Sequence, residues 1–263
     1  MLIQFLTLFP SMFDSPFAHS IIKRAQDNGL VKLETINFRA YAEDRHATVD
    51  DTPYGGGPGM ILKPEPIFKA VEAIEAQVAT KPYIILTSPQ GETFHQGIAV
   101  ELSAQPHLVF VCGHYEGYDE RIRTLADREL SIGDYVLTGG ELPAMVMAEA
   151  IIRLLPGVLG DPDAAQLDSF SGPEGILDYP QYTKPAEFRG LKVPAILLSG
   201  DHGKIAQWRR QQALLRTARR RPDLLAQLEL TAEELEMIEN NRLAYEDGQP
   251  DFVLKGGNSD ESD

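Results

Sequence analysis

The chain has 263 residues and a formal net charge of −15, with 24 Lys and Arg against 39 Asp and Glu. This length allows one large or two modest domains, and the 43% of hydrophobic residues is ample for a core. No apolar run reaches the roughly 20 residues of a membrane helix. The single cysteine, Cys112, excludes an internal disulfide and fits a reducing cytosol.

Apolar runs rich in β-branched residues predict strands along much of the chain. They occur at residues 2–9, 33–38, 83–87, 107–112, 132–137 and 195–198. The first run lacks a basic flank and a small-residue cleavage site. We therefore expect a first strand rather than a signal peptide, and a cytoplasmic protein.

Helical patterns separate most of the first five runs. Residues 17–28 end at Gly29, a usual place for glycine after a helix. Residues 64–78 begin with prolines and carry apolar residues at helical spacing. Residues 143–155 are almost wholly apolar, so this helix is either buried or part of a subunit interface. The alternation predicts an α/β domain with a mainly parallel sheet.

A change of composition follows at residues 156–175, which are rich in Gly, Pro, Asp and Ser. A connection of this length is usually a linker or a functional loop. Beyond it lies a smaller, mostly helical region, whose last helix begins with a capping box at residues 231–234. We expect a first domain at 1–158, a connecting loop at 159–175, a helical domain at 176–246 and an acidic, disordered tail at 247–263.

Three predicted strands end in bends that share turn-forming residues. Ser88 and Pro89 follow the first, residues 113–121 the second, and Gly139 and Gly140 the third. Parallel sheets place ligands at the carboxyl ends of their strands. Glycines there let another backbone or a flat ligand approach closely, so the bends predict one pocket, with Gly139 and Gly140 leaving room for its ligand. Ordinary turn punctuation is the alternative for these glycines.

A basic segment lies within this acidic chain. Residues 202–222 contain seven Lys and Arg and no acidic residue. Affinity for nucleic acid depends on such a local patch rather than on net charge. The segment therefore favours nucleic-acid binding, and a solvated helix face remains the alternative.

Six segments together resemble one known family. They are residues 50–60, 113–121, 131–143, 167–170, 179–185 and 197–202. In this order they are similar to the TrmD family of bacterial tRNA (guanine-N1)-methyltransferases, of the SPOUT class, over residues 1–245. The resemblance implies a deep trefoil knot in the parallel sheet of the first domain.

The resemblance also implies that S-adenosylmethionine binds folded in that knot. The positions expected to contact it are Leu86, Thr87, Ser88, Pro89, Gly113, Tyr115, Glu116, Ile132, Gly133, Tyr135, Leu137, Gly139, Gly140 and Pro143. A requirement for Mg²⁺ is implied as well, although no carboxylate cluster in the sequence locates the ion. We further expect a homodimer with the active site between subunits, which an apolar helix at 143–155 would support.

Methyl transfer to N1 of guanine requires a base for the N1 proton and a cation or donor near O6. By resemblance, Asp168 is the base and Arg153 stabilises O6, and the target is guanosine-37, immediately 3′ of the anticodon. The alternatives are a loop aspartate capping a turn and an arginine favoured at a helix C-terminus.

Contacts with tRNA are expected from a glycine loop and from the basic segment. The residues are Gly55, Gly56, Gly57, Lys204, Arg209, Arg210, Arg219 and Arg220. Backbone N–H groups of the glycine loop could face a phosphate, with a hinge loop as the alternative. Trp208 could stack on a base, but a core position is our preferred interpretation.

Two other functions fit parts of the sequence. A non-catalytic RNA-binding module would keep the basic segment without needing Asp168 or the glycine bends. A phosphate-handling enzyme could use the glycines at residues 55–59, although neither the dinucleotide-binding nor the P-loop spacing is present.

Overall fold

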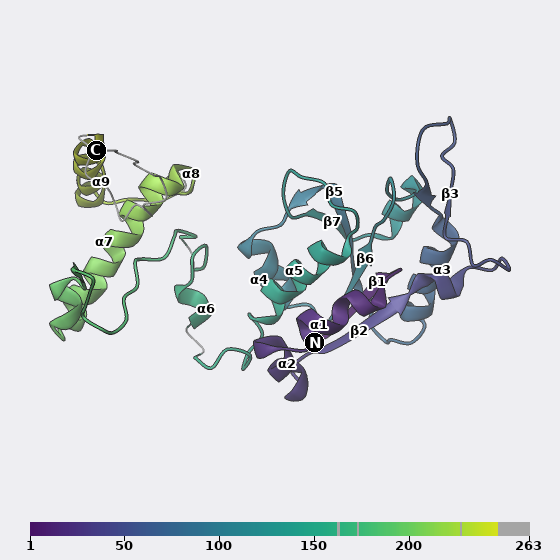
Figure 1. Ribbon diagram of the computed structural model, residues 1–263, viewed down its shortest axis with the longest axis horizontal. Helices are drawn as coiled ribbons and strands as arrows, with labels where there is room; N and C mark the ends of the chain where they lie inside the picture. Colours follow the sequence, from purple (N-terminus) through teal and green to yellow (C-terminus); the bar gives the residue numbers. More distant parts are fainter. Residues whose placement is uncertain (162–163, 173, 227, 247–263) are drawn as a thin grey trace, which may run out of the picture. The chain divides into compact units, whose positions relative to one another are not determined.

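The computed structural model describes residues 1–161, 164–172, 174–226 and 228–246, so the predicted tail at 247–263 lies outside the described residues. The chain forms two compact units, Met1–Ala165 and Gln166–Asp263 (Figure 1). Within the described residues, no helix is both long and apolar enough to cross a membrane.

The first unit is built on a five-stranded parallel sheet in the order β2-β1-β6-β5-β7. The strands are β1 (Leu2–Thr7), β2 (Lys32–Asn37), β5 (Tyr83–Thr93), β6 (His107–Cys112) and β7 (Arg128–Ser131). The predicted α/β class with a mainly parallel sheet is confirmed. Strand β6, with every residue buried, lies at the centre, as its unbroken apolar sequence requires.

Helices cover both faces of this sheet (Figure 1). On one face lie α1 (Asp14–Phe17), α2 (Ser20–Asp27), α4 (Gln96–Ser103) and α5 (Glu141–Ile152), and on the other lie α3 (Pro64–Glu75) and the 3-10 helices η2 (Phe38–Tyr41) and η3 (Glu120–Leu125). Alternate strand residues point to opposite faces. Phe5 of β1 accordingly stacks on Phe110 of β6 in the first core, while Leu6 belongs to the second.

The helix predictions for the first unit are largely confirmed. Helix α2 ends at Asp27 with Asn28 as its C-cap, and Gly29 follows with φ of +70°, where a side chain would be unfavourable. Helix α5 buries six of its apolar residues on one side, whereas Leu142 and Val146 are each 52% exposed. The remaining elements of the unit are η1 (Pro10–Phe13), β3 (Asp50–Asp51) and β4 (Ile61–Leu62).

Two strand predictions are wrong. Residues 132–137 form a loop, in which Val136 is 82% exposed. The strand is β7, just before this loop, and it is not an apolar run because it contains Arg128 and Glu129. These charges are tolerated because Arg128 ion-pairs with Glu92 and Glu101 at the sheet edge. The run at 195–198 is instead the 3-10 helix η4 (Ala195–Leu198), which begins after a proline and pairs with no strand in the described part of the chain.

The second unit is mostly helical after a hairpin of β8 (Glu187–Phe188) and β9 (Leu191–Lys192). Its helices are α6 (Ala164–Leu167), which crosses the unit boundary, α7 (His202–Arg220), α8 (Pro222–Leu225) and α9 (Ala232–Glu246). The predicted capping box of α9 is confirmed. Glu234 N donates to Thr231 Oγ1 at 3.2 Å, and Thr231 N donates to Glu234 Oε2 at 2.9 Å.

Candidate active site

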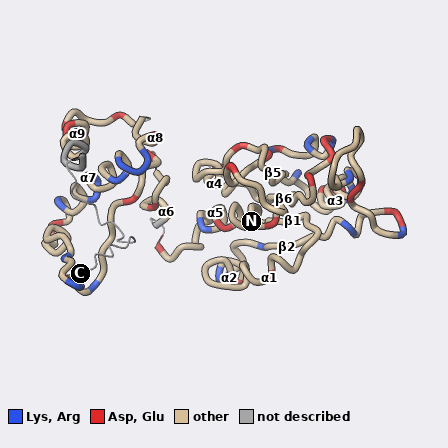
Figure 2. The backbone as a smooth tube through the Cα atoms, turned by 45° about the horizontal axis from the view of Figure 1, so that its top comes forward, with Lys and Arg blue, Asp and Glu red and all other residues tan. Residues whose placement is uncertain are grey.

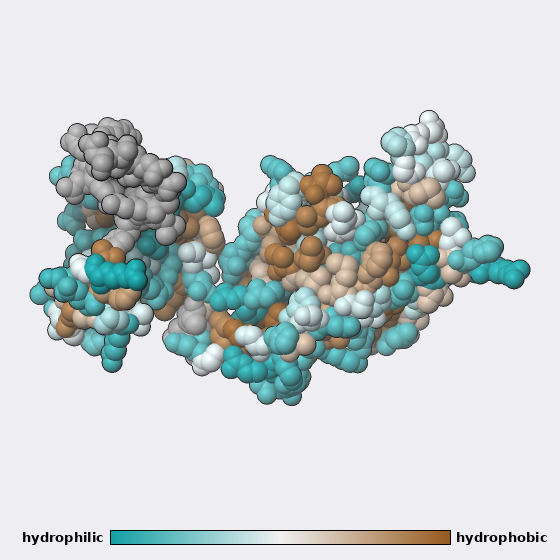
Figure 3. Space-filling model, in the orientation of Figure 1, coloured by the Kyte–Doolittle hydropathy of each residue, from teal (hydrophilic) through white to brown (hydrophobic). Residues whose placement is uncertain are grey.

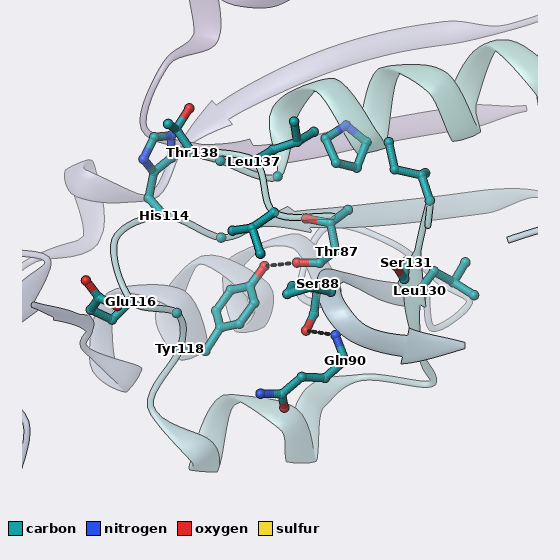
Figure 4. A pocket seen from close by; sticks show the side chains of 18 of the residues that line it. Thr87, Ser88, Gln90, His114, Glu116, Tyr118, Leu130, Ser131, Leu137 and Thr138 are labelled. Carbon is teal, nitrogen blue, oxygen red and sulfur yellow. Dashed lines mark hydrogen bonds between the residues drawn. The ribbon is translucent and has the colours of Figure 1, made fainter. Parts of the chain in front are cut away.

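Segments from β5, β6 and β7 line one pocket of about 340 Å³. Residues 87–90 lie in β5 where its pairing with β6 ends and its pairing with β7 shifts register. Residues 113–118 form the bend after β6, and residues 130–140 the end of β7 and the loop after it. Figure 4 shows side chains from all three segments around the same hollow. The three predicted segments therefore meet in one pocket, although β5 continues through Ser88 and Pro89 and residues 132–137 form a loop rather than a strand.

The residues expected to hold the cofactor mostly lie in this pocket. Those that line it are Thr87, Ser88, Pro89, Gly113, Tyr115, Glu116, Ile132, Gly133, Tyr135, Leu137, Gly139, Gly140 and Pro143. Leu86 does not, because its side chain is fully buried in the core on the α3 side of the sheet. Its position one residue before Thr87 places it on the opposite face of β5.

Several lining residues were not predicted. They are Gln90, His114, Gly117, Tyr118, Glu120, Arg123, Leu130, Ser131, Val136 and Thr138. Most belong to the motifs at 113–121 and 131–143. These motifs therefore indicated the segments that form the pocket, but not which of their residues line it. Arg123 lies outside them and is fixed by donating to Gln90 Oε1 at 3.0 Å.

Gly140 is required by close packing inside the protein. A Cβ there would collide with Thr87 Oγ1 and lie 2.7 Å from Gly113 N and 2.9 Å from the Cα of Cys112. Gly140 N also donates to Gly113 O at 2.8 Å. The glycine therefore allows the start of α5 to touch the end of β6. This packing explains the glycine without a ligand, so the expectation that Gly140 leaves room for a ligand stays a prediction.

A buried carboxylate supports the same bend. Glu141, 1% exposed, opens α5 and accepts a hydrogen bond from Thr7 Oγ1 at 2.7 Å. His114 Nε2 lies 3.2 Å from its other oxygen. A Cβ on Gly139 would overlap both His114 and Glu141, so this contact is what requires the first glycine of the pair.

Tyr118 lines the pocket and links β5 to β6. Its hydroxyl lies 2.7 Å from Val111 O and 3.2 Å from Thr87 O, and Figure 4 shows the second of these contacts. Burial raises the pKa of this hydroxyl well above its usual value, so it stays a neutral donor. Burial likewise raises the pKa of the Cys112 thiol, which fits a small core residue rather than a nucleophile.

The predicted glycine loop joins strands β3 and β4 and is anchored beside the pocket. Gly55, Gly56 and Gly57 have φ of +88°, +78° and +130°, in a region that favours glycine. At the base of the loop, Glu116 N donates to Met60 O at 3.0 Å. The bend after β6 thus contributes both to the pocket wall and to the loop's support.

The two predicted catalytic residues belong to different units. Arg153 is the half-buried C-cap of α5 in the first unit. Asp168 is half-buried directly after α6 in the second unit, where its carbonyl accepts a hydrogen bond from Ser171 N at 3.1 Å.

The basic segment forms α7, Arg221 after it and the first residue of α8, and its charges gather along α7 in Figure 2. Lys204, Arg209, Arg219 and Arg220 are exposed. Arg210 is instead half-buried and ion-pairs with Glu174 and with Glu234, the latter at 3.0 Å. The predicted basic stretch therefore divides into exposed residues and residues that hold the unit together.

The exposure of Trp208 is intermediate between the buried core position and the exposed base-stacking position that the sequence allowed. The residue is half-buried on α7, and its ring centroid is 6.5 Å from that of Tyr182. Next to it, the guanidinium of Arg209 lies 4.8 Å from the ring centroid of Tyr179. These aromatic contacts fix the residues around 179–182 against α7.

The fold and pocket define an α/β protein with a pocket on its parallel sheet, in the place where such sheets usually bind ligands, and a helical unit with a basic helix. The model of the family described as tRNA (Guanine-1)-methyltransferase TrmD matches residues 1–227, and the chain belongs to this enzyme family. The resemblance seen in the six motifs is confirmed.

Relatives named tRNA (guanine-N(1)-)-methyltransferase match nearly the whole chain. The protein of Staphylococcus carnosus (strain TM300) is 57% identical over 241 residues, which cover 91% of this chain and 97% of the relative. That of Dictyoglomus turgidum is 56% identical over 237 residues, covering 90% and 95%. That of Staphylococcus aureus (strain JH9) is 55% identical over 249 residues, covering 94% and 100%.

Proposed function

We propose that this enzyme transfers a methyl group from S-adenosylmethionine to N1 of guanosine-37 in tRNA. The observation that carries the proposal is the pocket at three adjacent strand ends in a chain of this methyltransferase family. The relatives' names support guanine as the methylated nucleobase and N1 as the atom that receives the methyl group. The position in tRNA and the methyl donor follow from the resemblance described above.

The pocket suits a nucleoside-type cofactor. Its volume of about 340 Å³ falls in the usual range for small-molecule sites. Its walls combine backbone groups of the three bends with the side chains of Tyr115, Glu116, Tyr135 and Leu137. S-adenosylmethionine would be held by these groups and would supply an electrophilic methyl. We also propose that the knot expected for this family shapes the site.

The chemistry of the acceptor needs two side chains. N1 of guanine carries a proton at neutral pH, and we assign Asp168 to accept it as the methyl group arrives. As that proton leaves, negative charge grows on O6, and we assign the guanidinium of Arg153 to stabilise it. A carboxylate is a weak base, so its placement against N1 governs how well it works.

For tRNA we propose a surface made of the exposed cations Lys204, Arg209, Arg219 and Arg220, together with the loop of Gly55, Gly56 and Gly57. The cations would neutralise backbone phosphates, and the loop would present N–H groups. We leave Arg210 out of this surface, because its guanidinium already pairs with two carboxylates.

We further propose a cytoplasmic homodimer with its active site between subunits. Apolar residues on one face of the first unit are exposed, as Figure 3 shows over the region of α4 and α5. They include Val100 of α4 and Leu142 and Val146 of α5. A patch of this kind typically marks an interface. Mg²⁺ stays a predicted requirement without a site, since no group of three ligating side chains occurs among the described residues.

Two measurements test this function against its rivals. Calorimetry should show binding of S-adenosylmethionine, and incubation with tRNA transcripts should transfer a labelled methyl. A non-catalytic RNA-binding module would bind tRNA and fail in both assays. Binding of a nucleoside triphosphate in place of S-adenosylmethionine would favour a phosphate-handling enzyme built on residues 55–59.

A further inference from the structure

The loop after α6 is hydrogen-bonded to α7 within the second unit. Leu177 N donates to the hydroxyl of Thr217 at 3.0 Å, and Arg216 Nη1 donates to Asp178 O at 3.2 Å. Thr217 is fully buried, and its hydroxyl donates in turn to Ala213 O at 2.7 Å. Residues 177–178 are therefore fixed to the C-terminal part of α7 by one buried and one half-buried side chain.

The segment at 177–178 in turn holds the residues that follow Asp168. Asp178 N donates to Ser169 Oγ at 2.9 Å, and Phe170 N donates to Ile176 O at 2.8 Å. These two bonds fold residues 168–171 against residues 176–178. A continuous series of hydrogen bonds thus leads from α7 to the residue next to Asp168.

Two arginines of the basic segment contact the same loop. Arg210 ion-pairs with Glu174, and the guanidinium of Arg221 lies 5.8 Å from the ring centroid of Phe170. Phe170 has φ of +67°, a left-handed conformation that a bulky residue keeps only where its surroundings fix it. Residues 168–172 and 174–178, the described part of the loop, therefore have a defined conformation in the second unit.

We propose that α7 is the frame that positions Asp168, with Thr217 as the buried positioning residue. This inference rests on the proposed role of Asp168 as the base. It divides the basic segment by function. Arg210, Arg216 and Arg221 hold the loop, while the exposed cations of the same helix face the tRNA. Helix α7 then both binds tRNA and positions Asp168, the proposed general base.

Thr217→Val tests the frame, because it keeps the shape of the side chain and removes the hydroxyl. Thr217 is fully buried and uncharged, so the change alters no group that tRNA could touch. With saturating tRNA and cofactor, the single-turnover rate should fall about tenfold or more, since small misplacements of a reacting group are costly. The Kd for tRNA should change less than twofold.

Thr217→Ser is the matched control, because it keeps the hydroxyl and loses only a methyl group. It should restore most of the single-turnover rate. Wild-type turnover in Thr217→Val would overturn the proposal. So would an equal loss in Thr217→Ser, since the hydroxyl would then not be the group that matters.

Hydrogen exchange supplies a readout that does not depend on methyl transfer. In Thr217→Val the amides of Leu177 and Asp178 should exchange faster, while the amide of Leu214, in the buried part of α7, stays protected. A uniform loss of protection would mean general damage and would contradict a local frame. Because this result is independent of turnover, it stands even if Asp168→Ala shows that Asp168 is not the base.

Glu174→Gln removes the loop's side of the Arg210 pair without touching a basic residue. We expect slower single turnover with tRNA affinity unchanged or higher, because the variant is less acidic. Glu233→Gln, at an exposed position on α9, makes the same charge change away from the loop. Equal effects of the two variants would assign the result to overall charge and contradict the frame.

Discussion

The pocket of the first unit and the Asp168 loop of the second are built in different ways. In the pocket, the backbone at Cys112 and Gly113 and the side chain of Thr87 lie so close to the start of α5 that Gly140 has no space for a Cβ. In the loop, the conformation depends on a few side chains, such as Thr217 and Arg210, that reach from helix α7. We infer that substitutions that add side-chain atoms disturb the pocket, whereas substitutions that remove side-chain atoms disturb the loop.

The largest effect should come from the loop itself. Asp168→Ala removes the proposed base, and methyl transfer in single turnover should fall by about 10²-fold or more. Cofactor affinity, measured by calorimetry, should barely change, because the pocket lies in the first unit. Turnover near that of the wild type would remove Asp168 from this role.

Adding atoms to the pocket should give the next largest effect. Gly140→Val forces a branched side chain against Thr87 and Gly113, and we expect a loss of about 1–3 kcal/mol in unfolding free energy together with weaker S-adenosylmethionine binding. Gly160→Val is the control, since a Cβ there meets no atom within 4 Å. Equal stability of both variants in urea titrations would contradict the close packing assigned to Gly140.

Removing exposed charge from α7 should leave both regions intact and weaken tRNA binding alone. In the double variant Arg219→Gln with Arg220→Gln, the log–log dependence of affinity on salt should flatten by roughly 0.7–0.9 for each phosphate that is no longer neutralised. Arg24→Gln, at an exposed position on α2, is the control for loss of a surface cation away from α7. An unchanged slope in the double variant would mean that the phosphate contacts with tRNA lie elsewhere, for example around residues 50–60 and 179–185.

The smallest effect should come from the support beneath the pocket. Glu141→Gln keeps an oxygen for Thr7 Oγ1 but loses the charge beside His114. We expect a loss of about 1 kcal/mol in unfolding free energy, the size of a typical hydrogen bond. Chemical denaturation measures it, and a variant more stable than the wild type would show that the buried charge is a net cost.

The sequence allowed much of the first unit to be predicted because its core is patterned locally. Uninterrupted apolar runs such as β6 and a glycine after α2 are visible without any tertiary contact. Strand β7 was missed because Arg128 and Glu129 find their partners only once the sheet has formed. Gly140 was expected to leave room for a ligand. It does line the pocket, but the sequence could not show that a Cβ there would also collide with Thr87, Cys112 and Gly113, which are distant in sequence.

The division of the basic segment could not be predicted for the same reason. Arg210 looks like Arg209 in the sequence, yet its partners Glu174 and Glu234 lie 36 and 24 residues away. Only the folded unit shows that one arginine is paired and the other is exposed. Motifs thus identified where the chemistry lies, and tertiary contacts determine which side chain does what.

The most direct test of the proposed activity is to map the modified base in a tRNA transcript by mass spectrometry. After reaction with S-adenosylmethionine, we expect one methyl group per tRNA, on N1 of guanosine-37, and none in a transcript carrying adenosine at that position. A methyl group on another nucleotide, on another atom of guanosine-37, or no transfer at all would contradict the proposed activity.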